Sequence, residues 1–170
     1  QALGAAHPDT LTSVNNLAYL LKAKGDLAGA EPLYRRALAG CERALGVAHP
    51  DTLTSVNNLA GLLYSKGDLA EAEPLYRRAL ARREQVLGAA HPDTLTSVNN
   101  LAVVLQAKGD PAEAEPLYRR TLAGRERALG VAHPQTLQSV NNLAVLLQAK
   151  GDLAGAGADM LVGDGVAKAN

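Results

Sequence analysis

The chain has 170 residues, with 17 basic and 17 acidic side chains and a formal charge of +0. Because a neutral chain has no long-range field of one sign, its charge argues against binding to nucleic acid or to an anionic membrane. No segment approaches the roughly 18 consecutive apolar residues that cross a bilayer. The first residues also lack the basic start and apolar stretch of a signal peptide, so none is expected.

A repeat of 42 residues dominates the sequence. The dipeptide His-Pro recurs at steps of 42, beginning at His7, His49, His91 and His133, and the residues in between are nearly copied. A fixed period of this size is typical of a stacked array, in which each unit buries its apolar face against its neighbours. Recent duplication and consensus-like engineering both explain the similarity of the copies.

The first helix of the first copy is predicted to run from about Pro8 to Lys24. Proline suits the first helical position, and Asp9 lies in the first turn, where the helix dipole favours a negative charge. Gly25 supplies the left-handed residue that ends the helix. The predicted apolar stripe consists of side chains at helical spacing, namely Leu11, Val14, Leu17, Ala18 and Leu21.

The second helix is predicted to begin after its N-cap Asp26 and to end at Gly46. In the next two copies the N-cap aspartate precedes a glutamate by three residues, which is a capping box. The predicted stripe consists of Ala30, Leu33, Tyr34, Ala37, Leu38 and Leu45. Pro32 lies inside this helix, and we expect a bend there rather than a break because the apolar register continues through it.

Two antiparallel helices per copy, joined by a Gly-Asp turn, predict an all-α fold. The large and small stripe residues resemble the tetratricopeptide pattern, and the phrases HPDT, NNLA, KGD and AEPLYRRAL resemble the longer repeats of kinesin light chains and nephrocystin-like proteins. The usual unit has about 34 residues, and this one is longer through an extended second helix. The resemblance covers residues 1 to 154 and implies a right-handed α-solenoid of helix hairpins. It does not extend to the heptad coiled coil of kinesin light chains.

The period also assigns boundaries. Residues 1–4 are assigned to the remnant of a preceding second helix, 5–46, 47–88 and 89–130 to three repeats, 131–156 to the first helix and turn of a fourth, and 157–170 to a divergent tail. Gln135 replaces the first-turn aspartate in the fourth copy, which weakens that helix start by about 0.5 kcal/mol. Both ends are expected to expose apolar surface, and such surfaces tend to associate.

The resemblance implies that the first helices line a concave groove. Four residues per copy are predicted to face it: Thr12, Asn16, Tyr19, Lys22, Thr54, Asn58, Gly61, Tyr64, Thr96, Asn100, Val103, Gln106, Gln138, Asn142, Val145 and Gln148. The copies diverge most at two of these four positions, those of Tyr19 and Lys22. A surface tuned to a ligand and mutational drift on a solvent face both explain the difference.

An asparagine pair recurs in each first helix, at 15/16, 57/58, 99/100 and 141/142. Because asparagine is an indifferent helix former, its repeated presence needs a reason. Asn15 and its equivalents are expected to form hydrogen bonds between copies. Asn16 and its equivalents are expected to bind a peptide backbone, since an amide both donates and accepts. For each member of the pair the other role is the alternative.

Several other chemistries are not expected. The four histidines occur one per copy, so stacking separates them and no metal site is predicted. Arg35 and Arg36 are predicted on a solvated convex face, with Glu31 and Arg35 as an (i, i+4) pair. A basic stripe for phosphate or acidic ligands is the alternative. No catalytic constellation, phosphate loop or zinc spacing is present, so we expect neither an enzyme nor a cofactor.

Cys41 is the only cysteine, which excludes an intrachain disulfide and favours a reducing, cytoplasmic location. The matching positions of the next two copies are Arg83 and Arg125, which predicts a site that is at least partly exposed. We favour drift at a surface position over a redox-sensing thiol, because nothing in the sequence activates it.

The leading functional hypothesis is a protein-interaction scaffold or adaptor that holds an extended peptide in the concave groove. Kinesin light chains take acidic, Trp-containing peptides, but basic side chains are sparse on this groove face, which disfavours that ligand. The alternative is a structural spacer or self-associating array that stacks end to end and has no groove ligand.

Overall fold

The computed structural model describes residue 4 and residues 7–151. The chain divides into two compact units, Gln1–Val86 and Leu87–Asn170, and each is described by itself. The predicted tail at 157–170 and nearly all of the predicted remnant at 1–4 lie outside the described residues. None of the described helices is both long and apolar enough to span a membrane.

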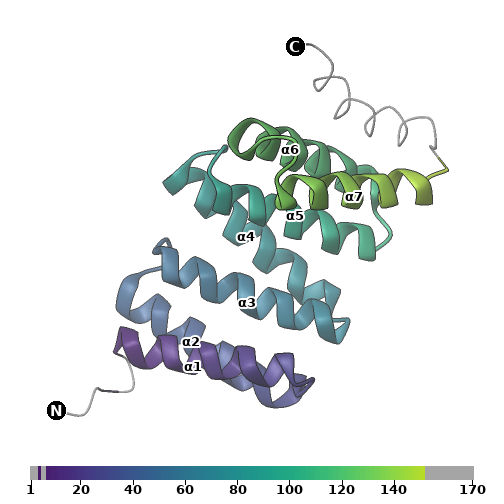
Figure 1. The fold of residues 1–170 in the computed structure, drawn as a ribbon. Coiled ribbons are helices and arrows are strands. Elements are labelled where there is room, and N and C mark those ends of the chain that lie inside the picture. The colour runs from purple at the N-terminus through teal and green to yellow at the C-terminus, as the bar shows by residue number, and fades with distance from the viewer. Residues whose placement is uncertain (1–3, 5–6, 152–170) are drawn as a thin grey trace. The chain divides into compact units, whose positions relative to one another are not determined.

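The described residues form seven α-helices and no strand. The first unit contains α1 (Pro8–Ala23), α2 (Leu27–Leu45), α3 (Pro50–Lys66) and α4 (Leu69–Leu87), the last of which ends at the boundary. The second contains α5 (Pro92–Ala107), α6 (Pro111–Leu129) and α7 (Pro134–Ala149). We call α1, α3, α5 and α7 the A helices and α2, α4 and α6 the B helices. Within the units α1 packs on α2, α2 on α3, α5 on α6 and α6 on α7 (Figure 1), as an all-α repeat solenoid requires.

Every A helix begins at the proline of a His-Pro dipeptide, as predicted. The histidine of each dipeptide, for which no role was predicted, is the N-cap of its helix. His7 has an extended backbone, and its Nδ1 accepts a hydrogen bond of 3.2 Å from the backbone N–H of Asp9. His49, His91 and His133 do the same in their copies. The imidazole therefore satisfies a donor that the first helical turn leaves without a partner.

The B helices begin and continue as predicted. The Asp26 carboxylate accepts from the backbone N–H of Gly29 at 2.8 Å and caps α2, and Asp110 caps α6 in the same way. Pro32 lies inside α2, which runs without interruption from Leu27 to Leu45. The expectation that the proline does not break the helix is confirmed.

Glycine permits the tight connection that follows each helix. Gly67 is the C-cap of α3 with φ of 82°, in the left-handed region where a side chain would be strained. Gly46 ends α2 with φ of 88°. The reversal at Gly46 brings α3 back against α2.

Small residues allow the helices to approach closely around a buried tyrosine. In the first unit Ala18 of α1 packs into the core together with Ala30, Tyr34 and Ala37 of α2, and all four are buried. Ala114 and Tyr118 of α6 occupy the matching buried positions in the second unit. This alternation of large and small residues is the packing that the stripes predicted.

One stripe residue departs from its prediction. Leu17 of α1 is 50% exposed, whereas its equivalent Leu59 of α3 is 3% exposed. The reason is the position of the helix: α2 lies against α3 on the N-terminal side, but the described residues include no helix before α1. Burial of the whole stripe therefore requires a neighbouring helix on each side.

Candidate functional site

All sixteen predicted groove residues lie on the A helices, and the structure buries none of them. Thr12, Asn16 and Tyr19 are exposed on α1, and Thr54 and Tyr64 are exposed on α3. The remaining members of the set in these two helices, Lys22, Asn58 and Gly61, are partly exposed. Each unit therefore carries an accessible face along its A helices.

In the second unit the predicted face is less uniform. Gln138, Val145 and Gln148 of α7 are exposed, but the predicted residues of α5 and Asn142 of α7 are only partly exposed. Gln106 accepts a hydrogen bond of 2.8 Å from the hydroxyl of buried Tyr118. Its amide oxygen therefore has a partner inside the protein.

Lys22 and Gly61 come together although they are 39 residues apart in sequence. The ammonium Nζ of Lys22 on α1 donates a hydrogen bond of 2.7 Å to the backbone carbonyl of Gly61 on α3. A Cβ atom at Gly61 would lie 3.3 Å from this Nζ and 3.3 Å from the hydroxyl oxygen of Tyr76. The missing side chain thus makes room for the ammonium, whose partial burial lowers the pKa of Lys22.

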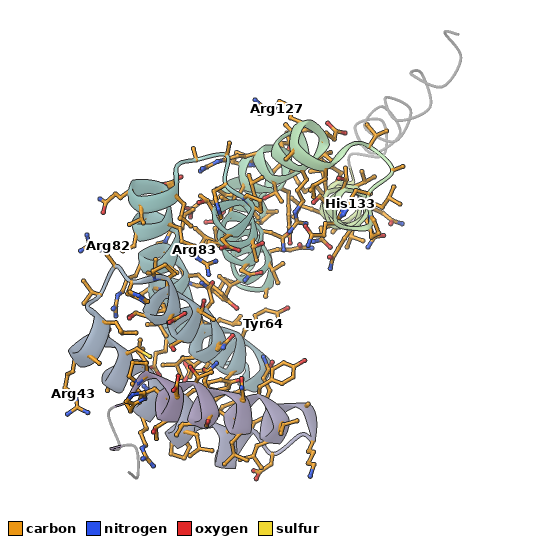
Figure 2. All side chains as sticks on the ribbon, turned by 60° about the vertical axis from the view of Figure 1, so that its left-hand side comes forward. Arg43, Tyr64, Arg82, Arg83, Arg127 and His133 are labelled. Carbon is orange, nitrogen blue, oxygen red and sulfur yellow. The ribbon has the colours of Figure 1, made fainter. Side chains whose placement is uncertain are left out.

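The aromatic side chains of the first unit occur as an outer and an inner set. Tyr19 and Tyr64 are exposed, at 62% and 38% of their surfaces, while Tyr34 and Tyr76 are buried (Figure 2 labels Tyr64). Burial, with a smaller contribution from Tyr64, raises the pKa of Tyr76 to about 12. Burial, with a smaller contribution from Tyr19, also raises the pKa of Tyr34.

Asparagines of successive copies form hydrogen bonds with each other between A helices. Nδ2 of Asn58 on α3 donates to Oδ1 of Asn15 on α1 at 3.2 Å. In the second unit Nδ2 of Asn142 donates to Oδ1 of Asn99 at 3.1 Å. Asn15 and Asn99 therefore bond the next copy, as predicted, and their partners are asparagines that were assigned to the groove. Asn57 instead donates to the backbone carbonyl of Leu53 in its own helix. Asn16 is exposed and free of a hydrogen bond to any described residue.

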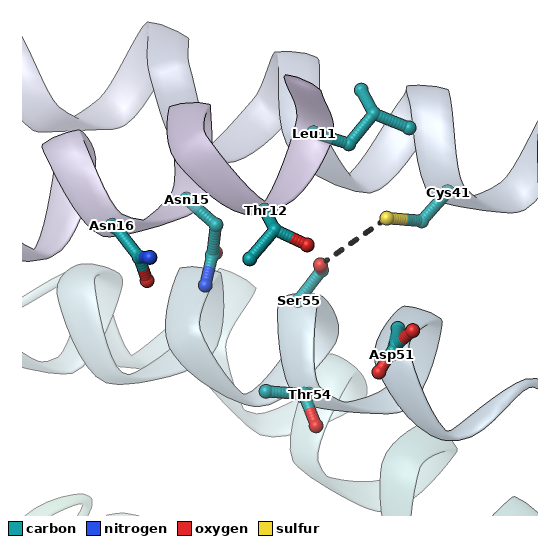
Figure 3. Close-up of a pocket in the computed structure, with 8 residues that line it drawn as sticks. All are labelled: Leu11, Thr12, Asn15, Asn16, Cys41, Asp51, Thr54 and Ser55. Carbon is teal, nitrogen blue, oxygen red and sulfur yellow. Dashed lines mark hydrogen bonds between the residues drawn. The ribbon is translucent and has the colours of Figure 1, made fainter. Parts of the chain in front are cut away.

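A cavity of about 190 Å³ lies between α1 and α3 (Figure 3). Its lining residues are Leu11, Thr12, Asn15, Asn16, Cys41, Asp51, Thr54 and Ser55. Three of them were predicted to face the groove: Thr12, Asn16 and Thr54. The cavity therefore opens on the accessible face of the A helices.

Cys41 at the base of this cavity is 5% exposed, and Arg125, two copies further on, is 6% exposed. The prediction of a partly exposed position is wrong. Arg125 is buried because its guanidinium reaches across to the next A helix, where it donates to the carbonyl of Gln135 and to Oγ of Ser139. The sequence feature that could have indicated this burial is Ser139, which follows Arg125 by 14 residues and accepts its hydrogen bond.

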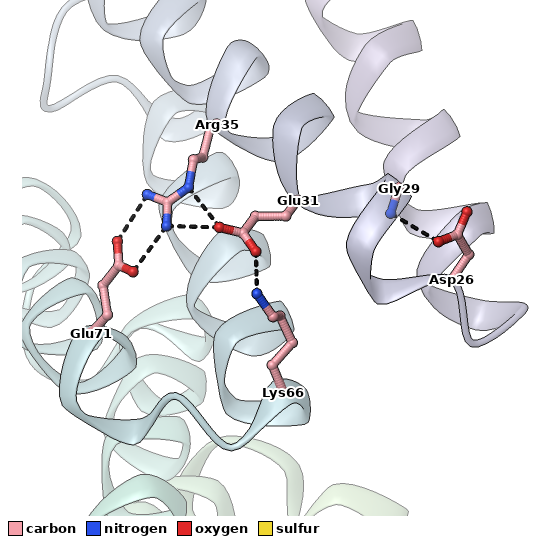
Figure 4. Close-up of polar contacts among 6 residues, drawn as sticks. All are labelled: Asp26, Gly29, Glu31, Arg35, Lys66 and Glu71. Carbon is pink, nitrogen blue, oxygen red and sulfur yellow. Dashed lines mark hydrogen bonds and ion pairs between the residues drawn. The ribbon is translucent and has the colours of Figure 1, made fainter.

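The B helices carry ion pairs between copies. Arg35 of α2 pairs with Glu31, as predicted, and also with Glu71 of α4 at 2.8 Å, while Lys66 pairs with Glu31 (Figure 4). Arg43 and Arg127 are exposed and project from their helices (Figure 2). This surface is largely exposed to solvent, and its acidic and basic side chains neutralise one another.

No metal-binding cluster of three or more His, Cys, Asp or Glu side chains occurs among the described residues. The histidines instead face their own helix N-termini. His7 Nδ1 lies 3.6 Å from the carboxylate of Asp9 in the same turn, and His49 lies 3.7 Å from Asp51. These distances describe local caps, not ligand sets.

The family model of the tetratricopeptide repeat matches residues 9–85, 51–127 and 93–156, and the chain belongs to this family. No curated protein matches the sequence. The tetratricopeptide fold is a general scaffold for protein–protein interaction, and proteins built from it are generally non-catalytic.

Solved structures give a more particular likeness. One contains the nearly identical TPR-like repeats of a Podosopora anserina protein of the kinesin light chain type. It is 31% identical, covers 94% of this chain and 75% of its own, and superposes with a TM-score of 0.79. BtubC (BKLC) from P. vanneervenii is 25% identical, covers 93% of this chain and 63% of its own, and has a TM-score of 0.83. The Rap protein complexed with Competence and Sporulation Factor is 17% identical, with a TM-score of 0.77, and shares the fold. The repeats are thus of the kinesin light chain type.

Proposed function

We propose that the chain is a non-catalytic scaffold that binds an extended peptide segment of a protein partner along its A helices. The observation that carries this proposal is the outward aromatic set of the first unit: Tyr19 is 62% exposed and Tyr64 is 38% exposed on neighbouring A helices. Exposed tyrosines bury a large area with few rotatable bonds, and they are enriched among the residues that dominate binding energy. A reducing cytoplasmic location is proposed as well, supported by the free thiol of Cys41.

The polar groups beside these tyrosines suit a peptide backbone. An extended peptide presents unpaired N–H and C=O groups that need partners when they leave water. Asn16 offers a donor and an acceptor, and exposed Thr12 and Thr54 offer hydroxyls on the same two helices. Asn58 has already committed one N–H to Asn15, so it contributes less.

Differences between the copies supply specificity. Position 19 and its equivalents hold tyrosine, glycine, valine and valine, and position 22 and its equivalents hold lysine, tyrosine, glutamine and glutamine. Within the first unit a peptide therefore meets an exposed phenol on α1 and a second phenol with a glycine on α3. In the second unit Val145 and Gln148 are exposed at these positions on α7.

The test begins with selection of a binding peptide from a random displayed library. Its Kd is then measured by fluorescence anisotropy for wild type, Tyr19→Ala, and Arg36→Ala on the exposed side of α2. Loss of an aromatic anchor should weaken binding by about tenfold or more, whereas Arg36→Ala should leave the Kd unchanged. Equal Kd values for the three proteins would refute the proposed face. Failure to select any peptide, together with a mass that rises with concentration in light scattering, would favour the self-associating array.

A further inference from the structure

The interface between α6 and α7 in the second unit is closed by a buried arginine. Nη1 of Arg125 donates to the backbone carbonyl of Gln135 at 3.0 Å and to Oγ of Ser139 at 2.9 Å. Both acceptors lie in the first two turns of α7. One guanidinium therefore fills the space beside these turns and satisfies two acceptors there.

The α2–α3 interface of the first unit keeps the acceptors and lacks the arginine. Two periods earlier, Cys41 occupies the position of Arg125, Ser55 that of Ser139 and Asp51 that of Gln135. Among the described residues, Cys41 Sγ is the only side-chain partner of Ser55 Oγ, at 3.7 Å, and sulfur is a weak acceptor. At this position the α2–α3 interface has a short thiol where the α6–α7 interface has the long cationic side chain that satisfies the site.

The cavity of about 190 Å³ lies at this place (Figure 3). Leu11, Cys41 and Ser55 are buried and form its base, while Thr12 and Thr54 are exposed at its mouth. For comparison, a cavity of about 150 Å³ accommodates benzene, so a planar guanidinium with part of its stem fits in volume.

The charge at this site is acidic. Asp51 lines the cavity, and the structure pairs its carboxylate with His49 in the same turn, at 3.7 Å. The sequence at the α6–α7 interface shows the opposite arrangement, with the arginine present and Gln135 in place of the aspartate. The cavity therefore combines a carboxylate, a buried hydroxyl and a helix backbone carbonyl, all of which accept hydrogen bonds from a cation.

We propose that this cavity binds an arginine side chain of the partner peptide, which takes the place that Arg125 occupies at the α6–α7 interface. The guanidinium donates to Ser55 Oγ and to the backbone carbonyl of Asp51, and the Asp51 carboxylate offsets its charge. This inference deepens the proposed function and rests on it, since it assigns the peptide an arginine beside Thr12 and Thr54.

The test uses N-ethylguanidinium as the probe, with neutral N-ethylurea of the same shape as its control. Titration into the ¹⁵N-labelled protein should shift the amide signals of Asp51, Thr54 and Ser55 with guanidinium only. Cys41→Arg supplies the internal arginine of the other copy and should abolish these shifts. Ala39→Arg adds the same side chain at an exposed position of α2 and should retain them. Shifts that are absent in wild type, or unchanged in Cys41→Arg, would overturn the proposal.

A second pair of variants decides the question if Cys41→Arg does not fold. Both variants keep the cavity. Ser55→Ala removes the hydroxyl that accepts from the cation, and Asp51→Asn removes the negative charge that offsets it, so the Kd for N-ethylguanidinium should rise by about tenfold in each. Unchanged Kd values in both variants would contradict the assigned contacts.

The selected peptide separates this inference from the proposed function. Replacement of its arginine by citrulline, which keeps the shape and removes the charge, should weaken binding to wild type by about tenfold but should not affect binding to Cys41→Arg. If citrulline changes nothing while Tyr19→Ala still weakens binding, the arginine site is wrong and the peptide face stands. If N-ethylguanidinium binds as described but no peptide does, the proposed function is wrong.

Discussion

The ammonium of Lys22 lies 2.7 Å from the backbone carbonyl of Gly61 and links the A helices of the first two copies. Both residues occupy positions that differ among the copies, and they were predicted separately as parts of a binding face. The structure shows that they form one feature, because a glycine is what leaves space for the lysine. This site is therefore particular to the first unit.

Gly61→Val, which introduces the residue of the third and fourth copies, should release Lys22. The new Cβ would lie 3.3 Å from both Nζ and the Tyr76 hydroxyl, so the ammonium must move toward solvent. Since burial lowers the pKa of Lys22, its pKa should rise in the variant. NMR titration of the Lys22 side chain measures this change. Thr54→Val on the same helix is the control and should leave the titration unchanged.

Asn15 and Asn58 should be energetically coupled. Their hydrogen bond joins two copies, so a double-mutant cycle with alanine should give an interaction free energy of about 0.5–1.5 kcal/mol. Urea unfolding of the four proteins measures it. The same cycle with exposed Asn16 in place of Asn15 should give a value near zero, and equal coupling in the two cycles would contradict the assigned bond.

The B-helix ion pairs should make stability depend on acid pH. Hydrogen bonds from Lys66 and Arg35 hold the pKa of Glu31 below its ordinary value of 4.5, and Arg35 does the same for Glu71. A carboxyl whose pKa is lower in the folded state stabilises the protein above pH 4.5, and this contribution is lost as the pH falls through the folded-state pKa. Because these side chains are partly exposed, the network contributes about 0.5–1 kcal/mol.

Urea midpoints measured from pH 6 to pH 3 test this dependence. Glu31→Gln should be less stable than wild type at pH 6 and should lose less stability on acidification. Arg36→Gln removes an exposed cation of the same helix and should leave the slope of wild type unchanged. A Glu31→Gln profile parallel to that of wild type would show that the network contributes nothing.

Gln135→Asp should stabilise the second unit. The substitution restores the first-turn aspartate of the other copies and places a carboxylate near Arg125, whose burial lowers its pKa. The helix dipole and this charge together favour the variant by about 0.5–1 kcal/mol. Thermal unfolding should show a higher Tm for Gln135→Asp than for wild type, whereas Gln135→Asn, of the same length without the charge, should not. Equal Tm values for Asp and Asn would contradict the electrostatic account.

The helices were predictable because their signals are local. Pro8 at the first helical position, Asp26 as an N-cap and Gly25 after the helix each act within a few residues, and the structure confirms their helix limits. The role of His7 was missed although its position before Pro8 was visible, since an imidazole is an uncommon cap. Local sequence signals were therefore sufficient to predict the helices.

The contacts between copies were less predictable. In the sequence, Cys41 at the position equivalent to Arg125 resembles mutational drift on the surface. The structure shows that this position is buried and that the Arg125 guanidinium reaches Ser139 from it. In the same way, each asparagine of a pair has a plausible role by itself, and only the register between α1 and α3 joins Asn58 to Asn15. Such contacts depend on how neighbouring helices are offset, which a helical period does not specify.

The central claim, that a peptide binds along the A helices, is tested most directly by site-specific photocrosslinking. p-Benzoylphenylalanine is placed at Tyr19 on α1 in one protein and at Arg36 on α2 in another, and each is irradiated with the selected peptide. The account predicts a crosslinked adduct from position 19, competed by unlabelled peptide, and none from position 36. An adduct from position 36 alone would contradict it.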